Sequence, residues 1–181
     1  MKEILISLAR ASIMSGLDKG VMQLDKVRDE YPFLQEQGAC FVTLTLEDEL
    51  RGCIGSTKAY RTLLEDLVHN AQAAAFRDPR FMPLTQEELQ SVRIEVSLLS
   101  EPKALEYTDM FDIKNKVRIG IDGVILKLGN NQATFLPQVW EMLKSHELFF
   151  SHLCEKAGLG IECLSKHPQI LVYQVEKIKE N

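Results

Sequence analysis

The sequence predicts an α+β protein in which a mainly antiparallel sheet is flanked by helices. Its strand segments follow one another through short turns and do not alternate strictly with helices, a pattern typical of antiparallel sheets. Segments with helical spacing of apolar residues precede and follow these strands. With 181 residues and 45% hydrophobic content, the chain is expected to form one domain over residues 1–181. A smaller helical lobe around residues 17–37 is compatible with this pattern.

A helix and a hairpin are the first predicted elements. Residues 4–13 carry apolar side chains at helical spacing, which predicts an amphipathic helix. Residues 38–46 then alternate with period two, which indicates a strand with one buried face. Glu47 and Asp48 turn the chain into a second strand at residues 50–55, so the two strands form a hairpin.

Two helices and a strand come next. Leucine and alanine residues between positions 63 and 75 form one stripe at about 100° per residue, which predicts a long helix that packs closely against another element. Pro79 disfavours helical geometry at the residue before it, so the helix should stop there. Thr85 and Glu88 have the spacing of a capping box and predict a short helix. Residues 94–98 alternate and predict another strand.

Turn signals organise the second half of the chain. A loop is expected up to about residue 115, in the absence of a clear period. Asp122 and Gly123 lie between apolar residues and predict a hairpin turn, and residues 129–131 predict a second turn, which together imply a three-stranded meander. Pro137 suits the first turn of a helix. A further helix and a last strand are predicted over residues 149–157 and 170–175.

The charge balance and the apolar runs exclude several classes of protein. With 21 basic and 26 acidic side chains the net charge is −5, which disfavours nucleic-acid binding through phosphate neutralisation. One short basic cluster lacks the stacking aromatic residues that single-stranded ligands need, and consists of Lys114, Lys116 and Arg118. No apolar run has membrane length, and charged residues interrupt the N-terminal one, so we expect a cytoplasmic protein without a membrane span.

Cysteine and histidine spacing predicts neither a metal site nor a disulfide framework. No C-x-x-C pair occurs, so all four thiols are expected to be reduced. The four cysteines are Cys40, Cys53, Cys154 and Cys163. The histidines do not complete a ligand set with them. Since the glycines do not form a G-x-G-x-x-G or P-loop pattern either, we expect no metal and no nucleotide cofactor.

The strongest chemical signal is Leu-Arg-Gly-Cys-Ile-Gly at residues 50–55, called the motif strand below. Residues two apart in a strand share a face, so Arg51 and Cys53 should project together if Leu50 and Ile54 point into the core. A guanidinium beside a thiol favours the thiolate, which is the reactive form of cysteine. The motif strand is therefore the first candidate for a functional site.

Structural and functional interpretations of the motif strand both stand at this point. Cys53 is either a small core residue or a catalytic nucleophile that carries an acyl, thioester or redox intermediate. Arg51 either forms an ion pair with Glu95 or binds an anionic substrate, with Glu95 orienting it or acting as a base. Gly52 and Gly55 would let a substrate approach the backbone closely.

Two further groups of polar residues are secondary candidates. Asn70 lies at the edge of the predicted apolar helix stripe, where its amide would bridge buried backbone or, alternatively, face a substrate. Arg77, Asp78 and Arg80 form a charged loop, which is either a self-bonded turn or a surface for an anion or a protein partner.

These stretches together resemble the AMMECR domain family, whose hallmark is the motif strand. The resemblance covers most of the chain. Besides the motif strand it rests on Gly-x-x-Phe-Val-Thr-Leu at 38–44, Asn-x-x-Ala-Ala-Ala-Phe-Arg-Asp-Pro-Arg-Phe-x-Pro-Leu at 70–84, Ile-Glu-Val-Ser at 94–97, Gly at 123, Thr-Phe-Leu-Pro-Gln-Val-Trp at 134–140 and Leu-Cys-x-Lys-Ala-Gly-Leu at 153–159.

The resemblance implies two unequal lobes with the hallmark motif near the cleft between them. It also implies membership of the bacterial and archaeal AmmeMemoRadiSam system, whose other members are a Memo-like protein and a radical S-adenosylmethionine enzyme. It brings no established reaction, since a fold does not determine a function. Two hypotheses follow: a protein that binds or transforms a small anionic metabolite at the motif, and a non-catalytic adaptor for protein partners.

Overall fold

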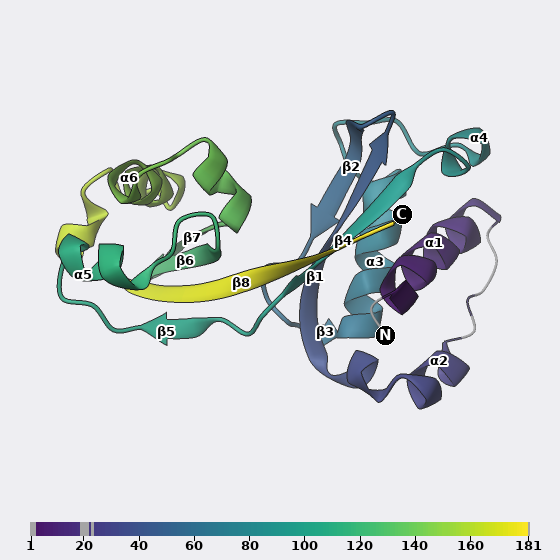
Figure 1. Cartoon of the computed structure of the whole chain (residues 1–181), viewed down its shortest axis with the longest axis horizontal. Helices are drawn as coiled ribbons and strands as arrows, with labels where there is room; N and C mark the ends of the chain where they lie inside the picture. Colours follow the sequence, from purple (N-terminus) through teal and green to yellow (C-terminus); the bar gives the residue numbers. More distant parts are fainter. Residues whose placement is uncertain (1–2, 19–21, 23, 181) are drawn as a thin grey trace. The chain divides into compact units, whose positions relative to one another are not determined.

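The computed structural model describes residues 3–18, 22 and 24–180. The chain divides into two compact units (Figure 1). Unit 1 comprises Met1–Leu99 and Glu176–Asn181, and unit 2 comprises Ser100–Val175. The described part of the segment 17–37 lies in unit 1, where it forms the end of the first helix, a short helix α2 (Asp25–Glu30) and a 3-10 turn η1 (Pro32–Gln35).

Antiparallel strands and two main helices form unit 1. Strand β1 is central in its sheet, pairing with β2 on one side and β4 on the other, while the short β3 pairs with the start of β1. The bounds are β1 (Gln37–Leu46), β2 (Glu49–Gly55), β3 (Arg61–Thr62), β4 (Arg93–Leu99), α1 (Glu3–Asp18), α3 (Leu63–Phe76) and α4 (Gln86–Leu89). The α+β class with antiparallel pairing and flanking helices is thereby confirmed.

The core of unit 1 lies between its sheet and its helices. Val42 and Leu44 are fully buried on β1, and α3 runs along β1 while α1 packs on α3 (Figure 1). The predicted turn at Glu47 and Asp48 is confirmed, since both residues have positive φ angles of 52° and 64°, as a two-residue hairpin turn requires. The predicted capping box at Thr85 is confirmed as well.

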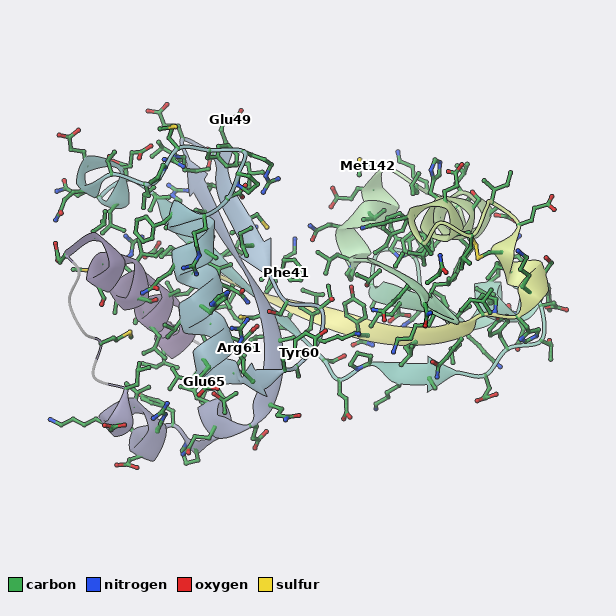
Figure 2. The ribbon with its side chains drawn as sticks, turned by 180° about the vertical axis from the view of Figure 1, so that it is seen from behind. Phe41, Glu49, Tyr60, Arg61, Glu65 and Met142 are labelled. Atoms are coloured by element: carbon green, nitrogen blue, oxygen red, sulfur yellow. A yellow bond between two sulfur atoms is a disulfide. The ribbon has the colours of Figure 1, made fainter. Side chains whose placement is uncertain are left out.

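A buried carboxylate connects α3 to the strands of unit 1. Asp66, in the first turn of α3, accepts hydrogen bonds from the Cys40 backbone N–H (2.9 Å), the Ser56 hydroxyl (2.6 Å), Arg61 Nε (2.9 Å) and the Asn70 amide (2.9 Å). Its side chain is 1% exposed, so these donors replace all of its water. Figure 2 shows Arg61 beside the first turns of α3. This network therefore determines where α3 begins relative to β1.

Four antiparallel strands in the order β7-β6-β8-β5 make up the sheet of unit 2, with the C-terminal residues of β8 assigned to unit 1. Trp140 stacks on Phe149 with ring centroids 3.7 Å apart, and both are buried in the core of this unit. The bounds are β5 (Lys103–Leu105), α5 (Met110–Lys116), β6 (Asp122–Leu128), β7 (Asn131–Phe135), η2 (Pro137–Glu141), α6 (His146–Lys156), η3 (Cys163–Lys166) and β8 (Gln169–Lys179).

The turn predicted at Asp122 and Gly123 is wrong. These residues begin strand β6, and the turn comes earlier, at Gly120, whose φ is +77°. Gly123 is required for packing, because a Cβ there would overlap the ring of Tyr173 on the neighbouring strand β8. The predicted three-stranded meander is consequently wrong, whereas its second turn, with Gly129 at φ +59°, is confirmed.

Two other predictions for unit 2 are corrected. The loop expected up to residue 115 contains β5 and α5, the latter capped by the Asp109 side chain on the Asp112 N–H at 2.8 Å. Cys154 and Cys163, expected to be reduced thiols, form a disulfide. Their nine-residue separation gave no signal, but the chain folds back between α6 and η3 through Gly158 and Gly160, both with positive φ.

We expect Asp66→Ala to destabilise the protein by about 3 kcal/mol, because it leaves a guanidinium and a buried backbone N–H without their acceptor. Chemical denaturation monitored by circular dichroism measures this loss. Asp29→Ala, which removes an exposed carboxylate from α2, should change the free energy of unfolding by less than about 0.5 kcal/mol. Equal stability of the two variants would contradict the central role of Asp66.

Candidate functional site

The motif strand is β2, and it contains a bulge. Gly52 pairs with Leu44, but Leu50 pairs with Thr45, so Arg51 is an extra residue without a partner on β1. A bulge interrupts the alternation of side chains along a strand. Leu50 is accordingly 42% exposed, so the condition that it points into the core is not met. The inference that Arg51 and Cys53 share a face loses its basis.

Arg51 pairs with the short helix α4. Its Nε donates to Glu88 Oε1 at 2.8 Å, and its Nη2 donates to Glu88 Oε2 at 3.0 Å and to the Met82 carbonyl at 2.9 Å. The predicted ion pair between Arg51 and Glu95 is wrong. Because β1 lies between β2 and β4, the strands that carry these two residues are not neighbours.

The glycines of the motif strand serve packing. A Cβ on Gly52 would overlap the carbonyl oxygen of Ala74, so the absence of a side chain lets α3 approach β2. A Cβ on Gly55 would overlap the ring of Phe41, which lies across from it on β1. The close approach expected at these glycines therefore involves a helix backbone and an aromatic ring of the protein itself.

Cys53 is held by the loop that follows α3. Its backbone N–H donates to Asp78 Oδ2 at 2.9 Å, and its carbonyl accepts from Arg80 Nη2 at 3.2 Å. Its sulfur accepts a hydrogen bond from the Thr43 hydroxyl at 3.3 Å, and the residue is partly exposed. Arg80, and not Arg51, is thus the guanidinium that contacts Cys53. Sequence reasoning missed this pair because 27 residues separate its members.

The charged loop is a self-bonded turn that also contacts β2. Asp78 is 5% exposed and accepts from the backbone N–H (3.1 Å) and the guanidinium of Arg80. Its hydrogen bonds with Arg80 hold the pKa of the Asp78 carboxyl far below its usual value, although burial opposes this. The Arg80 side chain remains 53% exposed. Arg77 donates to the His69 carbonyl at 3.4 Å.

A polar row crosses the face of the sheet opposite Val42 and Leu44. Thr43 pairs with Cys53 on β2 and with Glu95 on β4, so the three side chains share one face. The Glu95 carboxylate faces two ammonium groups of unit 1 from the end of β8. They belong to Lys177, at 3.7 Å, and Lys179, at 3.4 Å. Lys177 and Lys179 are two residues apart, a spacing that places side chains on one face of a strand. The predicted last strand ended at residue 175 and therefore did not include them.

The remaining candidates have structural contacts. Asn70 is 2% exposed, and its amide donates to the Cys40 carbonyl at 3.0 Å, which confirms that it bridges buried backbone. Over the described ranges, no group of three or more histidine, cysteine, aspartate or glutamate side chains is arranged to hold a metal ion. In the same part of the chain, no helix combines the length and apolar content that a membrane span requires.

The two free cysteines provide an internal comparison. Burial raises the pKa of the Cys40 thiol and shields it, whereas Cys53 is partly exposed. Iodoacetamide should alkylate Cys53 in the native protein and label Cys40 roughly 100-fold more slowly, since Cys40 must wait for local opening. Peptide mass spectrometry of both peptides measures the ratio. Labelling of Cys53 only after denaturation would make it a core residue.

The ion pair between Arg51 and Glu88 should make stability depend on pH. Hydrogen bonds from Arg51, with one from the Thr85 N–H, lower the pKa of Glu88 from 4.5 to about 2. Because the folded-state pKa is the lower one, the stabilisation is complete above pH 4.5 and is lost as the pH falls through about 2.

We therefore expect Glu88→Gln to lower the free energy of unfolding by about 2 kcal/mol at pH 7, a figure reduced for the partial exposure of the pair. The difference from the unmodified protein should disappear near pH 2. Urea titrations across this pH range measure it, with the exposed neighbour Glu87→Gln as the control. A constant difference from pH 7 to pH 2 would contradict this explanation.

Comparisons with known proteins agree with this fold. A sequence profile of the AMMECR1 family matches residues 6–178. A protein of Thermofilum pendens is 35% identical over 96% of this chain and 85% of its own length, and one of Methanothermobacter thermautotrophicus is 36% identical over 95% and 89%. The crystal structure of the uncharacterized protein PH0010 from Pyrococcus horikoshii is similar, with a TM-score of 0.83, 32% identity, and coverage of 99% of this chain and 91% of that one. This chain therefore belongs to the AMMECR1 family.

Proposed function

We propose that this protein binds a small anionic metabolite on the unit 1 sheet and transfers a group to the sulfur of Cys53. The observation that carries the proposal is the row of Cys53, Thr43 and Glu95, which places a partly exposed thiol, a hydroxyl and a carboxylate on three adjacent strands. Free cysteines in cores are usually enclosed, as Cys40 is. Cys53 therefore suits a nucleophile better than it suits a core residue.

The charges of the row suit an anionic substrate. Lys177 and Lys179 would bind the anion, and Glu95 would act as the base. In the transfer, a bridging water carries the thiol proton to the Glu95 carboxylate, since β1 lies between the strands of Cys53 and Glu95, and the sulfur forms a bond with the acyl carbon of a thioester substrate. The carbon–sulfur bond of the substrate breaks, and its thiolate leaves with the electron pair. The Thr43 hydroxyl bonded to the sulfur would hold it in position.

Membership of the AMMECR1 family supports a second part of this proposal. By its resemblance to proteins of the AmmeMemoRadiSam system, the chain would act in the cytoplasm beside a Memo-like protein and a radical S-adenosylmethionine enzyme. The disulfide between Cys154 and Cys163 is unusual for a cytoplasmic protein, except in thermophilic organisms, where intracellular disulfides are common.

The alternative is a non-catalytic adaptor, and the loop after α3 favours it. Met82 is 80% exposed, and the side chain of Arg80, two residues earlier in the same loop, is 53% exposed, a combination of apolar and cationic groups common at protein interfaces. In this alternative Arg77, Asp78 and Arg80 would shape a surface for a partner, and Cys53 would have no chemical role.

Acetyl-coenzyme A, an anionic thioester, is a suitable probe. We expect the native protein to gain one acetyl group on the Cys53 peptide, detected by mass spectrometry. Cys53→Ser should abolish this gain and Cys40→Ser should retain it. The double change of Lys177 and Lys179 to glutamine should slow it about tenfold, the effect of losing roughly 1.4 kcal/mol of binding.

An unmodified Cys53, or acetylation as slow as that of an unstructured cysteine peptide, would contradict the transfer. Co-purification with the Memo-like protein distinguishes the adaptor. A complex that survives Cys53→Ser but is lost in Met82→Glu would establish the alternative, whereas a complex lost only in Cys53→Ser would favour a role for the thiol.

A further inference from the structure

Unit 2 contains a cavity of about 570 Å³ that none of the preceding roles involves. Its floor is formed by strands β5, β6 and β8. Lys103 pairs with Val172, and Asp122 pairs with Gln174, so these four side chains share one face of the sheet. Val172 is the apolar residue between them. This volume lies within the range of small-molecule sites, which is about 300–1,000 Å³.

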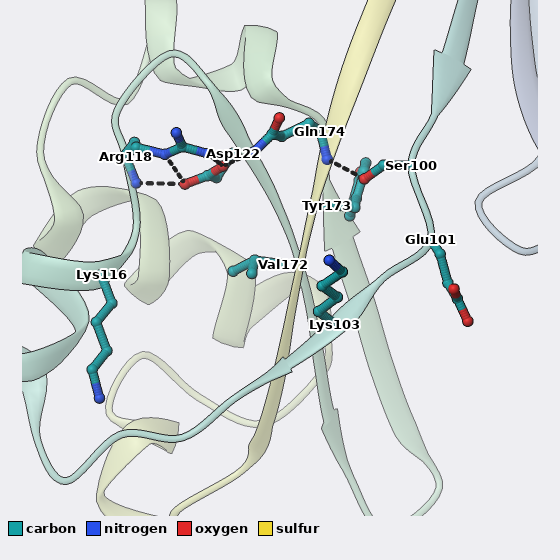
Figure 3. Close-up of a pocket in the computed structure, with 9 residues that line it drawn as sticks. All are labelled: Ser100, Glu101, Lys103, Lys116, Arg118, Asp122, Val172, Tyr173 and Gln174. Atoms are coloured by element: carbon teal, nitrogen blue, oxygen red, sulfur yellow. Dashed lines mark hydrogen bonds and ion pairs between the residues drawn. The ribbon is translucent and has the colours of Figure 1, made fainter.

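Three cationic residues are among those that line the cavity. Lys103 comes from β5, while Lys116 and Arg118 come from the end of α5 and the residues after it. Figure 3 shows Val172 between Lys103 on one side and the pair of Arg118 and Asp122 on the other. A ligand above Val172 would therefore meet positive charge from more than one direction.

Hydrogen bonds to Asp122 fix the Arg118 side chain without using all of its N–H donors. Its backbone N–H, Nε and Nη2 donate to the Asp122 carboxylate at 2.8, 3.0 and 2.8 Å. Its Nη1 makes no hydrogen bond to any residue that the structure describes. The carboxylate of Asp122 also lines the cavity, but its side chain is only 5% exposed and its charge is paired with the Arg118 guanidinium, which it orients.

Lys116 and Lys103 differ in how many N–H donors their ammonium groups have left for a ligand. Lys116 Nζ donates to Asp112 Oδ2 at 2.9 Å and to the Glu106 carbonyl at 2.7 Å, which leaves one of its three donors. The ammonium group of Lys103 has no partner within the described ranges. Glu101 also lines the cavity, but its carboxylate points away from Val172 (Figure 3).

We propose that this cavity is a binding site for a small organic oxyanion. The oxygens of the ligand accept from Lys103 Nζ and Arg118 Nη1, its carbon skeleton lies on Val172, and the amide of Gln174 borders it. Carboxylate and phosphate groups share this chemistry, since both present oxygens to a guanidinium and an ammonium group. The site is in unit 2 and does not depend on the function proposed for Cys53.

Isothermal titration calorimetry with citrate and with inorganic phosphate tests the proposal and separates the two sources of oxygen. At least one of them should bind with one-to-one stoichiometry. We expect Lys103→Gln to weaken that binding about tenfold and Lys103→Glu to abolish it. Lys166→Gln removes an exposed charge of unit 2 outside the cavity and should leave binding unchanged.

Amide chemical shifts locate the bound anion. Saturation with the anion should move the signals of Lys103, Val172 and Gln174, and the effect should persist in Cys53→Ser, which separates this site from the motif strand. No binding of either anion at millimolar concentration would overturn the proposal. Equal weakening by Lys103→Gln and Lys166→Gln would overturn it too, because it would show attraction to net charge only.

Discussion

The buried carboxylate of Asp66 is the interaction on which unit 1 depends. Four donors from the strands, from the loop after β2 and from α3 itself converge on it, and one of them is the backbone N–H of Cys40 in the central strand. A buried charge is stable only when hydrogen bonds replace its water, so this carboxylate tolerates one position of α3 relative to β1. The position of α3 in turn limits where β2 can lie, because Gly52 touches the Ala74 carbonyl.

A second aspartate acts just beyond the opposite end of the same helix. Asp78 accepts from the Cys53 N–H and is neutralised by Arg80, which also donates to the Cys53 carbonyl. The backbone of Cys53 is thus connected to both partners of one ion pair. The register of β2 against β1 places the Cys53 sulfur next to the Thr43 hydroxyl, and the hydrogen bonds to Asp78 and Arg80 hold the Cys53 backbone in that position. A group that must present its sulfur to a substrate benefits from such a rigid backbone.

The candidate site was partly predictable. The period of two places Cys53 and Glu95 on strands, and the structure brings both beside Thr43 on one face. The ion pair expected between Arg51 and Glu95 does not form, because β1 lies between their strands. Arg51 pairs with Glu88 of α4 instead. Nothing local in the sequence marks the bulge that makes Arg51 an extra residue. Contacts between distant segments, such as Arg80 with Cys53, have no periodic signal.

Local physics determined most of the elements. The α+β class, the hairpin turn at Glu47 and Asp48 and the capping box at Thr85 follow from side-chain periodicity, backbone sterics and hydrogen bonds three residues apart, all of which the sequence contains. Tertiary structure alone decided the role of Gly123, because that glycine makes room for Tyr173 from a strand 50 residues away. It also decided the pairing of Cys154 with Cys163 and the convergence of Lys103 and Arg118 on one cavity. These features depend on which chain segments become neighbours, and the packing of the whole core selects those neighbours.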